Sequence, residues 1–436
     1  MRAPGAGFGG IKTQASGGHT DVFLESPAIG AMAAGYTRIG ARLDWGGSIV
    51  FFGLGANAGS NVIDANDTGR ELQLALYDPT RATQPCAASA TCVSNPTSCA
   101  NSITFLGWNP VQGGDECGHG ATVSSHGQAG DALRLVVQPL QWNPDWNKPD
   151  CSQSSCGPSG VPVAVTYTFE LRYLSAHVVE VMSQVTSQES LDHPVTGQEF
   201  PTLYVAHGQN GPDLPLLLDA AGQSIALDTP ANDGFYVGEF NSPAPWVTFQ
   251  NTQKNYGVGL AMDQGITAYQ GWRGDGNTAP YFHNVRAKIA FGLGAGKTVR
   301  GLSYLALGGF GTVGAEIDQT LKKRPPFGVV DAPAAGAAVT YPANTPIAVA
   351  GWALDNTKVA SVRVEIDGVT AATLPVSGAR PDVCAVYPEY AGCPAVGYSG
   401  MVPTAGLSAC PHLLRVIASD GDGNSTTLGE RVITPG

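Results

Sequence analysis

The run Trp108-Asn-Pro-Val-Gln-Gly-Gly-Asp-Glu-Cys-Gly-His119 joins an aromatic ring, an amide, two carboxylates, a cysteine and an imidazole. Its proline and paired glycines predict a loop that can bring backbone close to a ligand. The ring can stack on a pyranose, the amide and a carboxylate can hold hydroxyls, and the imidazole can transfer a proton near neutral pH. The candidate functional side chains of this run are Trp108, Gln112, Asp115 and His119. The alternative is a disulfide-pinned loop, in which Cys117 is the feature that matters and the other groups only pack.

The segment 64–77 begins as a turn and continues as a predicted strand. Alternate residues of a strand share a face, so its three leucines take the core and the residues between them form a polar face. An amide, a tyrosine ring and a neighbouring guanidinium on that face suit the hydroxyls and the ring of a sugar. The candidates in this segment are Asp67, Arg70, Gln73 and Tyr77. The alternative is a solvated strand face with an ion pair between Asp67 and Arg70.

The segment Gln198-Glu-Phe-Pro-Thr-Leu-Tyr-Val-Ala-His207 offers a single carboxylate. Glu199 precedes an aromatic residue and a proline at the start of a predicted strand. A carboxylate there can be desolvated and its pKa raised, as acid–base catalysis requires. His207 is a candidate substrate-binding or assisting group. The alternative for Glu199 is an ordinary surface glutamate.

A fourth cluster runs from Tyr269 to His283 and combines aromatic, glycine and polar residues in one predicted loop. Sugar sites need apolar faces for stacking and planar polar groups for hydroxyls. Trp272 and Arg273 are therefore candidate substrate-binding residues. The alternative is an ordinary packed β-turn region.

Other chemistries lack their sequence patterns. The chain has no GxSxG, P-loop, HExxH or helix-opening GxGxxG pattern, which argues against serine hydrolase, nucleotide, zinc-protease and dinucleotide sites. The cysteines form no CxxC pair, so no metal site and no cofactor are expected. The run Asp420-Gly-Asp422-Gly-Asn424 resembles the start of a calcium loop but lacks the downstream glutamate. A turn between the last two strands is the favoured interpretation, and a structural calcium ion stays an open alternative.

Short strands must position these candidates. Alternating, β-branched or aromatic segments recur along the chain, and long helical periodicity is nearly absent. The clearest predicted strands are residues 47–52, 132–138, 163–173 and 178–185. The best helix candidate is the short segment 314–324. The predicted fold class is all-β.

The length of 436 residues favours two or three domains. Glycine (57) and proline (31) are abundant and only 13% of residues are charged, which is typical of short strands joined by turns. Residues 321–340 have the composition of a linker. We place the boundary near Phe327, which gives domains of residues 1–327 and 328–436. The second has the size and strand rhythm of an immunoglobulin-like sandwich.

Charge and hydropathy limit the partners. The net charge is −12 and the one basic cluster, residues 322–324, is short, which argues against a nucleic-acid surface. No run approaches the roughly 18 apolar residues of a membrane span. The first ten residues lack the apolar centre of a signal peptide. The oligomeric state is not predicted.

The nine cysteines lie in loop-like segments, as in disulfide-stapled secreted proteins, so a secreted or cell-surface location is expected. Cys384 and Cys393 share one short loop and are expected to pair, which leaves Cys410 as the odd thiol. Cys117 can pair with any of the five other cysteines before residue 160.

Two parts of the chain resemble known families. Gly351-Trp-Ala-Leu-Asp, Val362-Arg-Val-Glu-Ile-Asp-Gly and His412-Leu-Leu-Arg-Val-Ile-Ala-Ser-Asp-Gly resemble the Ig-like modules appended to secreted bacterial enzymes and surface proteins. The stretches at residues 61–77, 108–115 and 198–204 resemble a bacterial family of carbohydrate-associated β-sandwich proteins. Its nearest known architecture is the galactose-mutarotase-like supersandwich of sugar epimerases, glycoside hydrolases and polysaccharide lyases. The resemblance implies a large two-sheet β-supersandwich followed by a small Ig-like β-sandwich.

The resemblance implies an enzyme that cleaves the glycosidic bonds of a polysaccharide or oligosaccharide, as a hydrolase with paired carboxylates or as a lyase with a His or Tyr base. For hydrolysis the expected pair is Glu199 with Asp115 or Asp67, assisted by His119 or His207. For a lyase the candidate cations are Arg70 and Arg273, although the acidic net charge argues against a strongly anionic substrate. The alternative is a non-catalytic glycan-binding or surface-adhesive protein.

Overall fold

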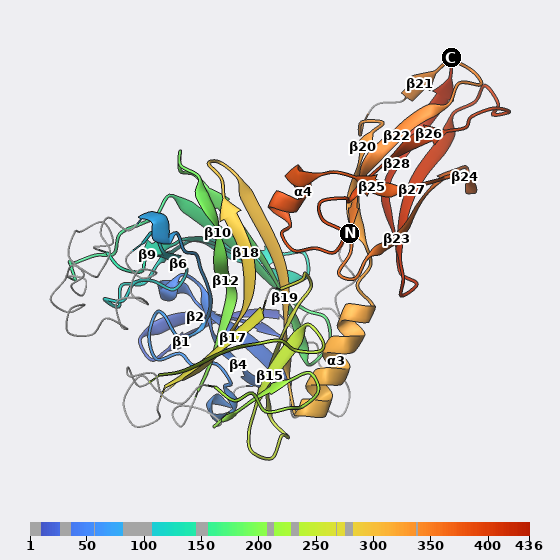
Figure 1. The fold of residues 1–436 in the computed structure, drawn as a ribbon. Coiled ribbons are helices and arrows are strands. Elements are labelled where there is room, and N and C mark those ends of the chain that lie inside the picture. The colour runs from blue at the N-terminus through green and yellow to red at the C-terminus, as the bar shows by residue number, and fades with distance from the viewer. Residues whose placement is uncertain are drawn as a thin grey trace. The chain divides into compact units, whose positions relative to one another are not determined.

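The computed structural model of the chain describes residues 10–26, 36–55, 57–81, 107–144, 156–206, 213–227, 235–266, 268–274, 282–336 and 339–436. The chain divides into two compact units, Gly5–Ile317 and Asp318–Gly436, here called the first unit and the second unit. Each unit is built from two β-sheets (Figure 1), so the predicted all-β fold is confirmed.

The larger sheet of the first unit has eleven strands. Nine of them lie in the order β1 (Gly10–Ser16), β2 (His19–Glu25), β3 (Thr37–Arg42), β4 (Ser48–Leu54), β5 (Leu72–Ala75), β12 (His193–Ala206), β18 (Phe282–Leu293), β17 (Ala268–Gly274) and β14 (Phe235–Phe240). The short β6 (Pro110–Val111) pairs with β5, and β9 (Leu140–Gln141) pairs with β6.

The second sheet of the first unit has eight strands. Their order is β13 (Leu216–Asp219), β15 (Trp246–Gln250), β16 (Gly257–Met262), β19 (Thr298–Leu307), β11 (Val178–Ser187), β10 (Val165–Tyr173), β8 (Ala132–Gln138) and β7 (Thr122–Ala129). The strands predicted at 47–52, 132–138, 163–173 and 178–185 correspond to β4, β8, β10 and β11 and are confirmed.

One hydrophobic core joins the two sheets of the first unit. Leu72, Leu74 and Leu76 point into it, as their alternation along the chain predicts, and are at most 3% exposed. Leu133 and Leu135 of β8 enter it from the other sheet. Because full burial of a leucine contributes about 1.5–3 kcal/mol, this alternation strongly favours the observed facing of β5.

The longest helix among the described residues is α3 (Phe310–Lys322), which confirms the predicted helix but begins four residues earlier. Val313, Gly314 and Ile317 are buried along one side of it, as in an amphipathic helix. Three short 3-10 turns also occur in the described part of the first unit: η2 (Leu43–Trp45), η3 (Ala58–Ser60) and η4 (Pro79–Arg81).

The second unit has a core of its own, which includes Val349, Val364, Leu414 and Val416. Its four-stranded sheet has the order β20 (Phe327–Ala332), β22 (Ile347–Leu354), β26 (Gly397–Val402) and β25 (Val376–Gly378). Its five-stranded sheet has the order β21 (Val339–Tyr341), β28 (Ser425–Pro435), β27 (His412–Asp420), β23 (Val359–Ile366) and β24 (Val369–Leu374). The helix α4 (Pro381–Val386) lies between β25 and β26 in the chain.

Two disulfides are present among the described residues. Cys384 pairs with Cys393, and Cys410 is an exposed free thiol, so both predictions are confirmed. Cys117 pairs with Cys156, one of the five partners that the sequence left open. The remaining cysteines, Cys86, Cys92, Cys99 and Cys151, lie outside the described residues.

The run at Asp420–Asn424 is a turn that joins β27 to β28, as predicted. The Asp420 carboxylate accepts hydrogen bonds from the backbone N–H groups of Asp422 and Asn424 at 2.9 and 2.8 Å. Within the described ranges, no helix is both long and apolar enough to cross a membrane.

Candidate functional site

A row of polar side chains crosses five neighbouring strands of the eleven-stranded sheet. It consists of Gln73 on β5, Thr202 on β12, Arg286 on β18, Gln270 on β17 and Glu239 on β14, and each is the register partner of the next. Residues directly opposite each other in antiparallel strands share a face of the sheet. We call this set the polar row.

Because successive side chains of β12 and β18 point to opposite faces of the sheet, the polar row faces away from the core. Leu203, Val285 and Ala287 are fully buried in the core between the sheets. Thr202 and Arg286 are the neighbours of these residues along the chain, so they point to the opposite face. β12, β18 and β17 lie side by side in Figure 1 and carry the centre of the row.

Glu199 is the centre of the site. One carboxylate oxygen accepts hydrogen bonds from the Tyr77 hydroxyl and from Arg286 Nη1, both at 2.6 Å. The other oxygen accepts from the Thr202 hydroxyl, also at 2.6 Å. A register shift between Glu199 and Thr202 brings these two residues of β12 to the same face. The carboxylate is thus held by three donors: one on β12, one on β18 and one two residues after the end of β5.

The network continues outward along the polar row. Arg286 Nε donates to Gln270 Oε1 at 2.7 Å, and Gln270 Nε2 donates to Glu239 Oε1 at 3.3 Å. Lys288 forms an ion pair with Glu239. Side-chain exposure rises along this path from 10% at Glu199 and 21% at Arg286 to 50% at Glu239. The row is therefore deepest near β12 and most open at the edge strand β14.

Burial and charge set the proton affinities of this group. Burial, and then the Glu199 charge, raise the pKa of the Tyr77 hydroxyl well above its ordinary value, so this phenol stays protonated. Burial lowers the pKa of Arg286 while the Glu199 charge raises it, and the net shift is upward. Burial, followed by the Glu199 charge, also raises the pKa of Tyr204 on the same strand. Glu199 therefore lies beside a phenol that stays protonated and a permanent cation, in addition to the Thr202 hydroxyl.

A second buried group of acids lies at the start of β5. Burial raises the pKa of Asp64 to about 7, and burial raises the pKa of Glu71 well above its ordinary value. Neither oxygen of Glu71 has a hydrogen-bond partner among the described residues. Arg70, whose charge acts on both acids, forms an ion pair with Asp67. That ion pair is the alternative that the sequence offered for Asp67 and Arg70.

The run that begins at Trp108 forms a wall beside Gln73. The backbone N–H of Gly113 donates to Gln73 Oε1 at 3.3 Å, and a side chain on Gly113 would come within 2.1 Å of the Thr68 carbonyl. Gln112 accepts from the backbone N–H of Leu74 and donates to the Gly46 carbonyl, each at 3.2 Å. Gln73 and Gln112 are 3% exposed. The side-chain amides of Gln73 and Gln112 thus join the wall to β5 and to the Gly46 carbonyl by hydrogen bonds.

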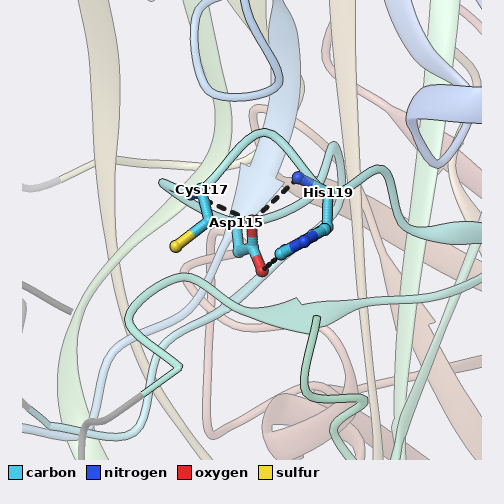
Figure 2. Close-up of side chains that lie close together, drawn as sticks. All are labelled: Asp115, Cys117 and His119. Carbon is cyan, nitrogen blue, oxygen red and sulfur yellow. Dashed lines mark hydrogen bonds and ion pairs between the residues drawn. The ribbon is translucent and has the colours of Figure 1, made fainter. Parts of the chain in front are cut away.

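Asp115, Cys117 and His119 form a compact cluster in this wall (Figure 2). One Asp115 oxygen accepts from the backbone N–H groups of Cys117 and His119 at 3.0 and 2.9 Å. The other lies 2.8 Å from His119 Nδ1. Asp115 is fully buried, so its carboxylate organises the turn from inside.

The same cluster is the one group of three metal-ligating side chains within reach of each other in the described ranges. The Cys117 sulfur, however, is bonded to Cys156. A disulfide sulfur is not a thiolate ligand, and both Asp115 oxygens already accept hydrogen bonds. The arrangement suits a loop-organising network better than a cation.

Trp108 is stacked inside the protein. Its ring lies on the His193 imidazole with centroids 3.6 Å apart and planes 14° apart, and its Nε1 donates to Glu189 at 3.1 Å. His193 is held between Asp78 and Glu189, each at 2.9 Å. Since Trp108 is 3% exposed, a sugar would reach it only if this stack opened.

The predicted site residues therefore fall into groups. Tyr77 and Gln73 lie with Glu199 on one face. The Asp115 side chain instead bonds to His119 and to the backbone of its own turn, and the Asp115 carbonyl accepts a hydrogen bond from the Thr68 hydroxyl. The segment expected to be a loop at Trp272 is the strand β17, and alternation places Trp272 on the face of Gln270 and Arg273 on the opposite face. His207 lies outside the described residues.

Sequence reasoning missed Arg286, Gln270, Glu239 and Lys288. Only strand register brings them to Glu199, and register was not predicted. A local signal did exist, because Asn284-Val-Arg-Ala-Lys-Ile289 alternates polar and apolar residues as a half-buried strand does. Two cations on one face of a strand beside Glu199 would have been better candidates than Arg273.

Comparisons with known proteins find only distant similarity to this chain. No protein-family model and no curated protein matches it. The Slr1438 protein of Synechocystis has a TM-score of 0.35 and 10% identity, covering 71% of this chain and all of its own. A polysaccharide lyase has a TM-score of 0.33 and 9% identity, covering 92% of this chain and 46% of its own. A putative aldose 1-epimerase of Klebsiella pneumoniae has a TM-score of 0.34 and 9% identity, covering 69% of this chain and 87% of its own. Likeness at this level leaves the activity to be argued from the site.

Proposed function

We propose that the first unit is an enzyme that cleaves a uronate-containing polysaccharide by β-elimination, with Glu199, Tyr77 and Arg286 as its catalytic residues. The observation that carries the proposal is the Glu199 carboxylate held at 2.6 Å by both a protonated tyrosine and an arginine. Elimination needs a base, a proton donor for the leaving oxygen and a cation that offsets the uronate charge. These three residues supply one of each.

The arrangement favours elimination over hydrolysis by paired carboxylates. Asp115 and Asp67, the partners considered for Glu199, are engaged by their own turns. Glu239 lies three strands away from Glu199, which corresponds to about 14 Å at the usual strand spacing. Hydrolytic carboxylate pairs are separated by roughly 5–10 Å.

In the proposed reaction Glu199 removes the proton from the sugar carbon that bears the carboxylate. The electron pair forms the new carbon–carbon double bond, the bond from the adjacent ring carbon to the glycosidic oxygen breaks, and the Tyr77 hydroxyl donates its proton to that oxygen. Arg286 binds the uronate carboxylate as negative charge develops. The proton then passes from Glu199 to Tyr77 across their 2.6 Å hydrogen bond, which restores both groups.

The test is a panel of pectate, alginate, hyaluronan, heparan sulfate, arabinoxylan and mannan, assayed for unsaturated products by absorbance and for new reducing ends. We expect unsaturated products from at least one uronate polymer. Glu199→Gln and Tyr77→Phe should each lower kcat by 100-fold or more, as loss of general acid–base catalysis does at about 10²–10⁴-fold. Glu180→Gln is the matched control, because Glu180 is also a buried carboxylate paired with an arginine, at 3.0 Å, in the other sheet.

The outcomes separate the alternatives. Reducing ends without unsaturated products would make the protein a hydrolase. Saturable binding that Glu199→Gln leaves intact, with no products of either kind, would support the non-catalytic alternative, which the complete hydrogen bonding of Glu199 also permits.

For the rest of the molecule we propose an extracellular location and an accessory, Ig-like role for the second unit. The support is the pair of disulfides, which persist in oxidising compartments. The second unit is a separate two-sheet structure with its own core.

A further inference from the structure

We infer that the polar row binds its polysaccharide by one end, with the terminal sugar at Glu199 and the chain leaving over Gln270 and Glu239 toward the edge strand β14. This inference rests on the proposed function and adds that the enzyme acts from a chain end. It also assigns Lys288 and Trp272 to subsites beyond the bond that is cleaved.

The inner end of the row is closed by described residues. At Gln73 the Gly113 turn lies directly on the amide, and a Cβ on Gly113 would be 2.9 Å from Gln73 Oε1. Beside it, Tyr77 packs with Val111 and the partly buried Trp142. A chain that lay across Glu199 in both directions would have to displace this wall.

Among the described residues, none closes the outer end of the row. Glu239 lies on β14, which ends the described path of the sheet, and its side chain is half exposed. From Glu199 on β12 to Glu239 on β14 the row spans three strand spacings, or about 14 Å. That length accommodates more than one sugar residue on one side of the cleaved bond.

The chemistry along the row suits an extended anionic chain. Arg286 and Lys288 lie two residues apart on β18, so both cations point to the same face about 7 Å apart. In the adjacent register row, Trp272 of β17 is the partner of Asn284, and the indole is only half-buried. Lys288 lies beside the row rather than farther along it, and its ion pair with Glu239 places its ammonium toward the outer end, where it can take a second uronate carboxylate. The indole on the other side of the row can stack on a sugar ring.

The experiment follows the size of the products from the polymers of the panel that the full-length protein cleaves. End-on binding predicts short unsaturated products from the first minutes and a viscosity that falls slowly relative to product formation. Random products of mixed length with a rapid fall in viscosity would overturn the inference and leave the proposed function standing. Failure to bind or cleave any panel member would overturn both.

Variants at the outer subsites provide a second readout. Lys288→Gln and Trp272→Ala should each raise KM for the polymer by about threefold or more, while kcat changes by less than about twofold. Lys12→Gln is the matched control, because Lys12 is also ion-paired with a glutamate, at 2.8 Å, on the opposite edge strand β1. A loss of kcat as large as the rise in KM would place these residues at the cleaved bond and contradict the inference.

Discussion

Asp64 is a buried acid that should make stability depend on pH. Burial raises its pKa from 3.8 to about 7, so the folded protein keeps the proton over a range in which the unfolded chain releases it. The free energy of unfolding should therefore fall as pH rises from about 4 to about 7, by at most on the order of 4 kcal/mol from this group. Asp64→Asn removes the effect.

We expect urea denaturation to show that Asp64→Asn gains stability relative to the wild type as the pH is raised from about 5 to about 8. Asp67→Asn is the control, because Asp67 is over a third exposed and paired with Arg70. A stability difference between Asp64→Asn and the wild type that stays constant with pH would show that Asp64 is ionised in the folded protein.

At the residue scale, the sequence predicts a site residue when a chemically suitable side chain also has informative neighbours along the chain. The sequence makes Glu199 a candidate because it precedes an aromatic residue and a proline, and Tyr77 a candidate because polar and apolar residues alternate along its segment. Arg286 was not found, since it lies 87 residues away from Glu199 along the chain and only register joins them. The three proposed catalytic residues come from β12, β18 and the segment that follows β5, and a single sequence does not specify which strands pair.

At the element scale, the wall that closes the polar row depends on a glycine. A methyl group on Gly113 would come within 2.1 Å of the Thr68 carbonyl and 2.9 Å of Gln73 Oε1. Gly113→Ala should therefore shift the turn and destabilise the protein by about 1–3 kcal/mol, as overpacking does. Because Gln73 lies beside the site, the variant should also lower kcat/KM on the polymer.

Gly311→Ala is the control for this variant. Gly311 lies in α3, and no atom would lie within 4 Å of an added methyl group. Alanine is favoured over glycine in helices by up to about 1 kcal/mol, so this change should be neutral or stabilising in urea denaturation. Equal stability of the two variants would contradict the close packing of the Gly113 turn.

The strands themselves could be predicted from alternation, but the layout of the site could not. β8 matches its predicted bounds, and the leucines of β5 face the core as expected. The glycines near Trp272 are typical of turns and predict a loop, yet β17 places Gly271 against the core residue Leu217 and the partly buried Leu227. A glycine in a strand can mark such close packing as well as a turn.

At the scale of the whole molecule, the net charge opposes the proposed substrate. The chain carries −12, and a polyuronate is also negative, so the two repel each other at long range although Arg286 and Lys288 attract the polymer within the site. Salt shortens the range of electrostatic forces from about 30 Å at 0.01 M to about 8 Å at 0.15 M. This screening should weaken the long-range repulsion more than the contacts inside the site.

We therefore expect kcat/KM on the polymer to rise about twofold or more over this range of salt. A trisaccharide, which carries few charges, should show a smaller rise. A steady fall of kcat/KM with salt on both substrates would mean that local attraction governs binding and that the net charge has no influence on it.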